Sequence, residues 1–175
     1  MDYDRIVQVL IVGDSDAKTC NLQYHLAHLR YFTYSLRIDP VVYTIQNDEE
    51  KVKFHLWNWN LYYRSNTIPR SSSRETSILL IAYNPMIATT FTSIEKWLDE
   101  NDSRFYSVQL RMLVEHISSH DRPREVQVGA GQTMADRLGL MYGEVDSSSE
   151  SYNNDLLELL VNEPMILPPL KVWSF

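Results

Sequence analysis

The chain has a single cysteine, Cys20, among its 175 residues, and this excludes a framework of internal disulfides and fits a reducing compartment. No apolar run approaches the roughly 18 to 20 residues that cross a bilayer. The first residues lack the basic and apolar regions of a signal peptide. An excess of basic residues is also missing, since the net charge is −7, which argues against general binding to nucleic acid. We therefore expect a soluble intracellular protein that does not bind nucleic acid directly.

A glycine is missing from the stretch that comes nearest to a functional motif. An apolar run is followed by Gly13 and, after only four residues, by Lys18 and Thr19, ahead of a segment with helical spacing. A phosphate-binding loop has this strand, loop and helix order, but it places four residues between two glycines before the Lys and Ser/Thr. Here the loop is one residue short, and Ala17 stands at the second glycine. Such a loop presents fewer N–H groups to a phosphate, and Asp16 adds negative charge.

Lys18 and Thr19 therefore have two interpretations. Either they still contact a bound phosphate, or they are left over from such a loop and Thr19 caps or packs the start of the helix. Asp14 and Asp16 precede the same helix. A negative charge there interacts favourably with the helix dipole, so these residues can take the place of a phosphate electrostatically. We favour the second interpretation.

Strands and helices are predicted to alternate along the rest of the chain. Apolar or alternating runs predict strands, at residues 6–12, 40–46, 52–57, 78–83, 106–114 and 140–142. Apolar residues spaced by three and four predict helices, at residues 18–30, 90–100, near 129–138 and at 155–162. The polar residues 58–77 are predicted to form a loop. This order predicts an α/β fold, with about six strands in a mostly parallel sheet, one antiparallel strand, and helices on both faces.

Five segments carry a resemblance to a known family, and they are Arg5–Leu22, Trp57–Trp59, Ala82–Asn84, Phe91–Leu98 and Glu125–Leu140. In order and spacing they resemble the Ras superfamily of small GTPases, and within it the Rab family. The resemblance implies the three-layer fold of P-loop NTPases. It runs from about Asp4 to Glu163, which is almost the whole chain. We therefore expect one domain at 1–163 and a separate tail at 164–175.

The resemblance also implies where Mg²⁺ and the phosphates would bind, and the residues there differ from the family pattern. The metal-associated aspartate falls on Asn58, the glycine that senses the γ-phosphate on Leu61, and the glutamine that positions water on Tyr62. The threonine of the first switch falls on Ser35, the one replacement that could still bind a metal. An amide at Asn58 keeps the shape of the carboxylate but loses the charge that favours Mg²⁺.

The two segments that would read the guanine base are altered as well. The Asn-Lys-x-Asp motif falls on residues 116–119, which read His-Ile-Ser-Ser, and the Ser-Ala-Lys element falls on 146–148, which read Asp-Ser-Ser. Lost hydrogen bonds to charged groups cost about 1.5 to 3 kcal/mol each, and a nanomolar affinity is worth about 12 kcal/mol. We therefore expect no nucleotide, other cofactor or metal, and no GTPase activity. The leftovers of the ancestral site are then Gly13, Lys18, Thr19, Ser35 and Asn58.

Aromatic residues gather in the polar loop that corresponds to the second switch, and they are Trp59, Tyr62 and Tyr63, while Trp57 ends the predicted strand just before it. Large aromatic residues in a loop are typical anchors of protein interfaces, and the alternative is that they fill the emptied nucleotide pocket. Rab proteins bind effectors through an aromatic triad on the switch face. Trp57 matches one member of that triad, whereas Pro40 stands where the family has phenylalanine.

The tail, residues 164–175, is apolar and rich in proline and has no cysteine. We therefore expect no prenyl anchor. Its aromatic residues Trp173 and Phe175 either fold back on the domain or dock in a groove of another protein.

Our leading hypothesis is a pseudo-GTPase, a Rab-like fold that binds no nucleotide and serves as a constitutive interaction or scaffold subunit of a larger complex. The first alternative is an atypical GTPase of vesicle trafficking, in which Lys18, Thr19 and Ser35 hold phosphate and metal. The second is a decoy that competes with an active Rab for its exchange factor or effector.

Overall fold

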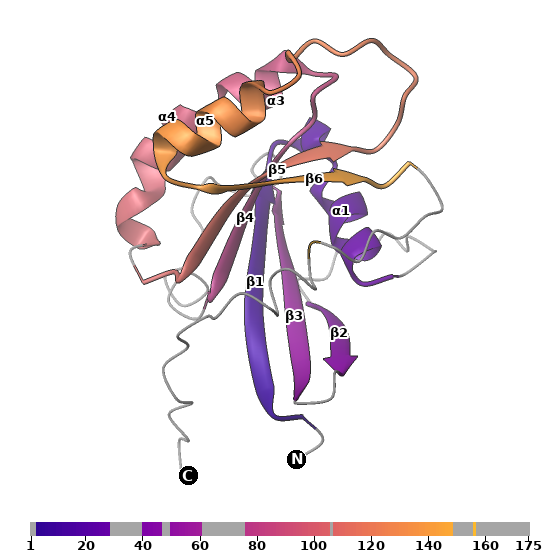
Figure 1. The fold of residues 1–175 in the computed structure, drawn as a ribbon, viewed down its shortest axis with the longest axis vertical. Coiled ribbons are helices and arrows are strands. Elements are labelled where there is room, and N and C mark those ends of the chain that lie inside the picture. Colours follow the sequence, from indigo (N-terminus) through magenta and orange to yellow (C-terminus); the bar gives the residue numbers. More distant parts are fainter. Residues whose placement is uncertain are drawn as a thin grey trace.

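The centre of the fold is a six-stranded sheet (Figure 1). The computed structural model describes residues 3–28, 40–46, 50–60, 76–105, 107–148 and Leu156. The strands are β1 (Arg5–Gly13), β2 (Val41–Gln46), β3 (Lys51–Asn60), β4 (Ile78–Tyr83), β5 (Leu110–Ile117) and β6 (Met141–Asp146), in the order β2-β3-β1-β4-β5-β6. β2 pairs antiparallel with β3, and every other pair is parallel. The predicted fold class is confirmed.

Helices cover both faces of this sheet. They are α1 (Thr19–Leu26), α3 (Ala88–Thr92), α4 (Ile94–Asn101) and α5 (Ala130–Leu138), with 3-10 turns η1 (Ser15–Ala17) and η2 (Asp102–Arg104). α1 lies on one face, and α3, α4 and α5 lie together on the other (Figure 1). Within the described ranges, every helix is too short or too polar to cross a bilayer.

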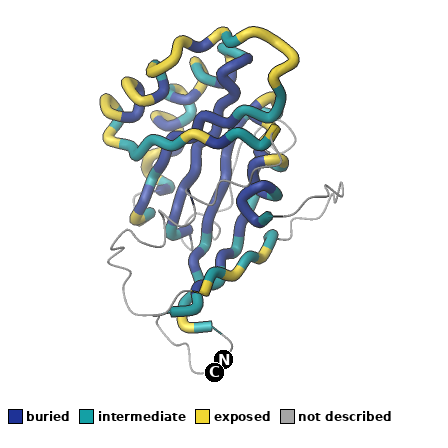
Figure 2. The backbone as a smooth tube through the Cα atoms, turned by 45° about the vertical axis from the view of Figure 1, so that its right-hand side comes forward, coloured by how far each residue is buried: buried dark blue, intermediate teal, exposed yellow. Residues whose placement is uncertain are grey.

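The alternation of side chains along β1 divides the core into two layers. Val9 and Ile11 pack with Leu22 of α1, whereas Leu10 and Val12 pack on the opposite face with residues of α4 and α5. All of β4 is buried, as expected for a parallel strand covered on both faces. The central strands are therefore the most buried part of the chain, and the exposed residues gather on the helices and connecting loops (Figure 2).

β3 is longer than the sequence predicts. Residues 58–60 were expected to open a loop, but parallel pairing with β1 continues until Asn60 lies opposite Gly13. The predicted place of Trp59 in an exposed loop is therefore wrong. Trp59 lies opposite Val12, is 8% exposed, and belongs to the core on the side of α4 and α5.

β5 lies further along the chain than its apolar run indicates. The predicted strand 106–114 begins only at Leu110 and ends at Ile117. Near its carboxyl end β5 contains Glu115 and His116, whose side chains are 3% and 0% exposed. Polar residues are tolerated in a buried strand when they have hydrogen-bond partners, and both residues have them.

The other helix predictions differ at their ends. The helix predicted at 90–100 is interrupted at Ser93, between α3 and α4. The hydroxyl group there bonds to a preceding carbonyl, since Ser93 Oγ donates to the Thr90 carbonyl at 3.4 Å, and such bonds disturb a helix. α1 ends at Leu26, short of the predicted residue 30. Of the predicted closing helix, only Leu156 lies within the described residues, and it is helical.

Candidate functional site

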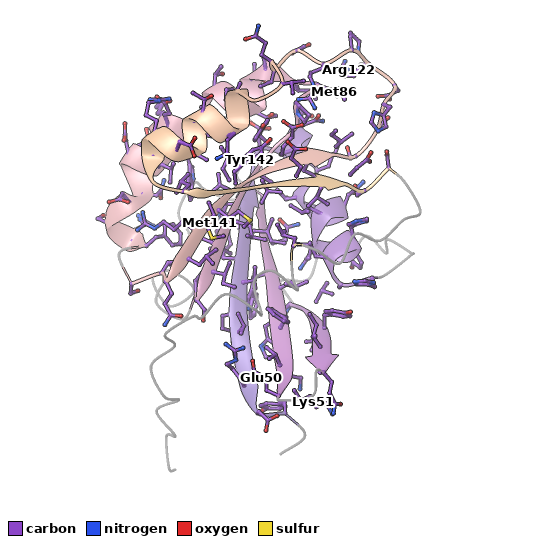
Figure 3. The ribbon with its side chains drawn as sticks, in the orientation of Figure 1. Glu50, Lys51, Met86, Arg122, Met141 and Tyr142 are labelled. Atoms are coloured by element: carbon purple, nitrogen blue, oxygen red, sulfur yellow. The ribbon has the colours of Figure 1, made fainter. Side chains whose placement is uncertain are left out.

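The candidate site lies at the edge of the sheet where β1, β3, β4 and β5 end. Because these strands are parallel, their carboxyl ends meet there, and open α/β sheets bind ligands at this edge. Residues 14–18 join β1 to α1 at the same edge. Figure 3 shows Met86 and Arg122 at this end of the molecule, and Glu50 and Lys51 at the opposite end.

The loop at residues 14–18 is a 3-10 turn that uses its N–H groups internally. The N–H groups of Ala17 and Lys18 donate to the carbonyls of Asp14 and Ser15, at 3.0 and 3.2 Å. The N–H of Asp16 donates to Asp14 Oδ1 at 3.3 Å, so Asp14 caps the turn. In a phosphate-binding loop such N–H groups point at the ligand. Here three successive ones already have protein acceptors.

Two buried side chains hold the carbonyl groups of the same loop. Asn84 follows β4, and its Nδ2 donates to the Asp16 carbonyl at 3.1 Å. His116 is near the end of β5, and its Nδ1 donates to the Ala17 carbonyl at 2.8 Å. Asn84 is 7% exposed and His116 is fully buried. The loop is therefore anchored to the ends of two neighbouring strands.

His116 is a neutral imidazole with a defined tautomer. Because a carbonyl can only accept, the Nδ1 that contacts Ala17 carries the proton, and Nε2 accepts from Ser147 Oγ at 2.8 Å. Burial lowers the pKa of His116 to about 4, so the ring is uncharged at pH 7. The resemblance assigns residues 116–119 and 146–148 to the guanine base. The structure joins these two segments to each other through this hydrogen bond.

Thr19 and Asn58, which the resemblance assigns to the metal, satisfy each other. Thr19 Oγ1 donates to Asn58 Oδ1 at 2.8 Å, and Asn58 Nδ2 contacts Cys20 Sγ at 2.7 Å. Thr19 is buried and makes no side-chain cap of α1, so of its two predicted local roles the structure supports packing. Burial raises the pKa of Cys20 and outweighs the opposite effect of the Asn58 amide. The cluster therefore carries no negative charge for Mg²⁺.

Gly13 lies where the loop passes closest to the rest of the fold. A Cβ atom there would lie 2.7 Å from Thr19 Cγ2 and 2.8 Å from the Ala82 carbonyl oxygen. The recess beside it, which Asp14, Thr90 and other residues line, has a volume of about 20 Å³. That volume suits about one water molecule. Close packing alone therefore favours glycine at position 13, whether or not a ligand binds there.

Lys18 is exposed and links η1 to α1 in the left-handed region, with φ 52° and ψ 46°. Residues with a Cβ atom are strained in that region by roughly 1 to 2 kcal/mol. The side chain of Lys18 is on the surface, where it could reach a ligand. Its backbone is the strained point of the loop.

Replacing Lys18 by glycine is expected to stabilise the fold by about 1 kcal/mol, because glycine adopts the left-handed region without strain. Denaturant unfolding of the two proteins measures the difference. Lys18→Ala is the matched control, since it removes the same amine and keeps the Cβ atom, and it should give no gain. Equal stability of Lys18→Gly and Lys18→Ala would contradict the strain.

Of the remaining predicted residues, Trp57 and Trp59 are the two that the structure describes, and both belong to β3. Trp57 is half-buried in β3, and its Nε1 donates to Gln8 Oε1 at 2.8 Å. Its role as an interface anchor stays a prediction, whereas Trp59 is a core residue. The other predicted site residues lie outside the described residues, and they are Ser35, Tyr62, Tyr63, Trp173 and Phe175.

A second polar cluster at this edge was missed by sequence reasoning. The carboxylate of Glu115 accepts from Arg124, from the Tyr83 hydroxyl at 2.7 Å, and from the Tyr142 hydroxyl at 3.2 Å. Tyr142 lies on β6 beneath α5 (Figure 3). A usable signal was present, because Glu115 and His116 directly follow a buried apolar run at the carboxyl end of a strand. Among the described residues, no three His, Cys, Asp or Glu side chains are grouped as metal ligands.

Comparison of the sequence with known proteins shows the family of this chain. The model of the Ras family matches residues 8–164. Ras-related protein Rab-19 of Rattus norvegicus is 28% identical over 172 residues, which cover 94% of this chain and 77% of the relative. Ras-related protein Rab-1C of Dictyostelium discoideum is 30% identical over 155 residues, covering 86% and 76%. Ras-related protein RABD1 of Arabidopsis thaliana is 25% identical over 155 residues, covering 87% and 75%. With a match over most of its length and Rab proteins among its relatives, this chain belongs to the Ras family and has the small GTPase domain of a Rab-like protein.

Proposed function

We propose that this Rab-like protein binds no guanine nucleotide and acts as a constitutive protein-interaction module, as a subunit of a larger complex. The observation that carries the proposal is the loop at residues 14–18, whose N–H groups have acceptors within the loop itself. A protein that holds no nucleotide has no nucleotide switch. Its binding to partners should then be independent of GTP and Mg²⁺.

Two further contacts support the loss of nucleotide binding. Thr19 gives its hydroxyl proton to Asn58, where the resemblance expects a metal ligand next to a carboxylate. His116 and Ser147 bond to each other in the segments that would read the base. A nucleotide would have to break these bonds as well as those of the turn, at about 0.5 to 1.5 kcal/mol each. It would also meet the charge of Asp16, which is exposed in the loop.

Isothermal titration calorimetry of the purified protein with GDP or GTP, in the presence of Mg²⁺, is expected to show no binding. Incubation of the protein with GTP and Mg²⁺ is expected to release no phosphate. The positive control is a Rab protein with an intact phosphate-binding loop, measured in the same buffer. Binding with micromolar or tighter affinity would contradict the proposal. Hydrolysis above the buffer rate would contradict the absence of enzyme activity.

The second candidate function is an atypical nucleotide-binding GTPase. The family match and the exposed Lys18 side chain favour it. It predicts that guanine nucleotide is released when the freshly purified protein is denatured, which chromatography of the supernatant detects.

A pull-down separates the proposed complex subunit from the decoy for an active Rab. A decoy should recover the exchange factors or effectors of vesicle trafficking. A subunit should recover the same fixed set of proteins whether or not GTP and Mg²⁺ are added.

A further inference from the structure

We propose that Trp57, Gln8 and His55 form a hydrogen-bonded row that holds the Trp57 indole ring in one orientation while His55 is neutral, and that releases the ring when His55 takes up a proton. The three side chains lie on one face of the sheet, because Gln8 of β1 is opposite His55 of β3, and Trp57 follows His55 by two residues. The row bears on the proposed function, on which this proposal rests, because Trp57 is a predicted anchor for a protein partner. It adds control of that anchor by pH.

The direction of each bond in the row follows from the chemistry of the groups. The Trp57 Nε1–H can only donate, so the Gln8 atom at 2.8 Å from it is the carbonyl oxygen Oε1. The other end of the same amide is then the NH₂ group, whose Nε2 lies 3.3 Å from His55 Nδ1. An NH₂ group can only donate, so His55 Nδ1 accepts. In this row His55 is therefore neutral and carries its ring proton on Nε2.

A proton on His55 Nδ1 is incompatible with the complete row. Both nitrogens of a protonated imidazole are donors, so Nδ1–H and the Gln8 NH₂ group would face each other as two donors. Turning the amide over gives His55 an acceptor, but it sets the NH₂ group against the Trp57 Nε1–H. No orientation of Gln8 satisfies both ends. Hydrogen bonds to charged groups are the stronger ones, so the bond from Trp57 is the one that breaks.

The groups around His55 shift its protonation to acidic pH. Burial and the charge of Lys53 on the same strand both lower the pKa of His55. Lys53 itself lies over the Tyr3 ring, with Nζ 4.6 Å from the ring centroid. The residues opposite His55 on the two neighbouring strands are Gln8 of β1 and Val42 of β2, and neither ionises. At pH 7 the ring is thus mostly uncharged, and acid is needed to charge it.

Solvent reaches this part of the sheet. Val42, which lies opposite His55, is 49% exposed, and Trp57 and His55 are half-buried. An indole ring whose N–H already has an acceptor offers its apolar surface to a partner, and a side chain that is already fixed loses less entropy on binding. Release of the ring in acid removes both advantages. Trp57 is therefore an anchor at neutral pH and a weaker one in acid.

Side-chain NMR of the ¹⁵N-labelled full chain tests the row. At pH 7.5 the correlations of the His55 ring should show a proton on Nε2 and none on Nδ1. On titration toward pH 5.5, the indole N–H signal of Trp57 should shift with the same midpoint as the His55 ring signals. That indole signal is identified as the one that Trp57→Phe lacks. His55→Gln should abolish its shift.

Two further variants separate the row from a direct effect of the charge on His55. Gln8→Leu removes the amide and keeps both rings, so His55 should still titrate while the Trp57 signal loses most of its shift. His120→Gln is the matched control, since it removes an exposed histidine that pairs with Asp146. It should leave the titration of Trp57 unchanged.

A proton on His55 Nδ1 at pH 7.5 would overturn the row. A Trp57 signal that stays fixed while His55 titrates, or that follows His55 equally in Gln8→Leu and in the unchanged protein, would do so as well. If Gln8→Leu fails to fold, Gln8→Met removes the same amide under the same criterion. Adding millimolar GDP and Mg²⁺ at pH 7.5 keeps the two proposals apart. Shifted signals of residues 14–18 would refute the proposed function, whereas the row is judged only by His55 and Trp57.

Discussion

Replacing Glu115 by alanine is expected to destabilise the fold by about 3 kcal/mol, which is the lower end for breaking a buried ion pair. Glu115 is buried and pairs with Arg124, and it accepts from the Tyr83 hydroxyl. Burial by itself raises the pKa of Glu115, but the hydrogen bonds from Arg124 and Tyr83 and the charge of Arg124 outweigh it. The net pKa lies below its usual value, so the carboxylate is ionised at pH 7. Denaturant unfolding at pH 7 measures the loss.

Two variants show whether the loss comes from the buried carboxylate. Glu115→Gln keeps the shape and an acceptor for Tyr83 while removing the charge, so its cost should lie between those of the alanine variant and the unchanged protein. Glu95→Ala removes a similar pair with Arg137 at an exposed position, and its effect should be far smaller, since solvent screens surface pairs. Equal effects of Glu115→Ala and Glu95→Ala would contradict the prediction.

Lowering the pH from 7 to 5 is expected to remove about 2 kcal/mol of stability through His116 alone. Burial lowers the pKa of this residue to about 4 in the folded protein, whereas the unfolded chain has the usual value near 6.5. Between these two values the unfolded state binds the proton and the folded state does not. The free energy of unfolding therefore falls as the pH drops from about 6.5 toward 4, and it is unaffected by this group above that range.

The measurement compares unfolding of the unchanged protein and of His116→Gln at both pH values. Subtracting the two removes the contributions of other groups that face this ring, such as His25, whose pKa is lowered mainly by burial, and Asp146, whose pKa is lowered by Ser148 and His120 against the effect of burial. The glutamine variant should lose less stability on acidification. The same loss in both proteins would show that His116 is not the titrating group.

The periodicity of apolar residues was sufficient for the fold class. The run at 78–83 is fully buried as β4, and Leu22 and Leu26 lie on the inner face of α1. These patterns depend on residues that are close in sequence, so they could be read directly. They failed at the polar ends of β3 and β5, where burial depends on partners from elsewhere in the chain. Trp59 was misplaced for this reason, because it follows Asn58 and precedes Asn60 in the sequence.

The order of residues 13–19 is enough to show that the loop after β1 is one residue too short and lacks the second glycine of a phosphate-binding loop. The hydrogen bonds that this shortened loop makes instead depend on how the chain folds. His116 lies 99 residues from Ala17 in the chain, and Asn84 lies 68 residues from Asp16. Hydrogen bonds need contact within about 3 Å, and only the parallel pairing of β1, β4 and β5 brings these groups that close. The sheet therefore supplies the partners of the loop, which no local pattern could reveal.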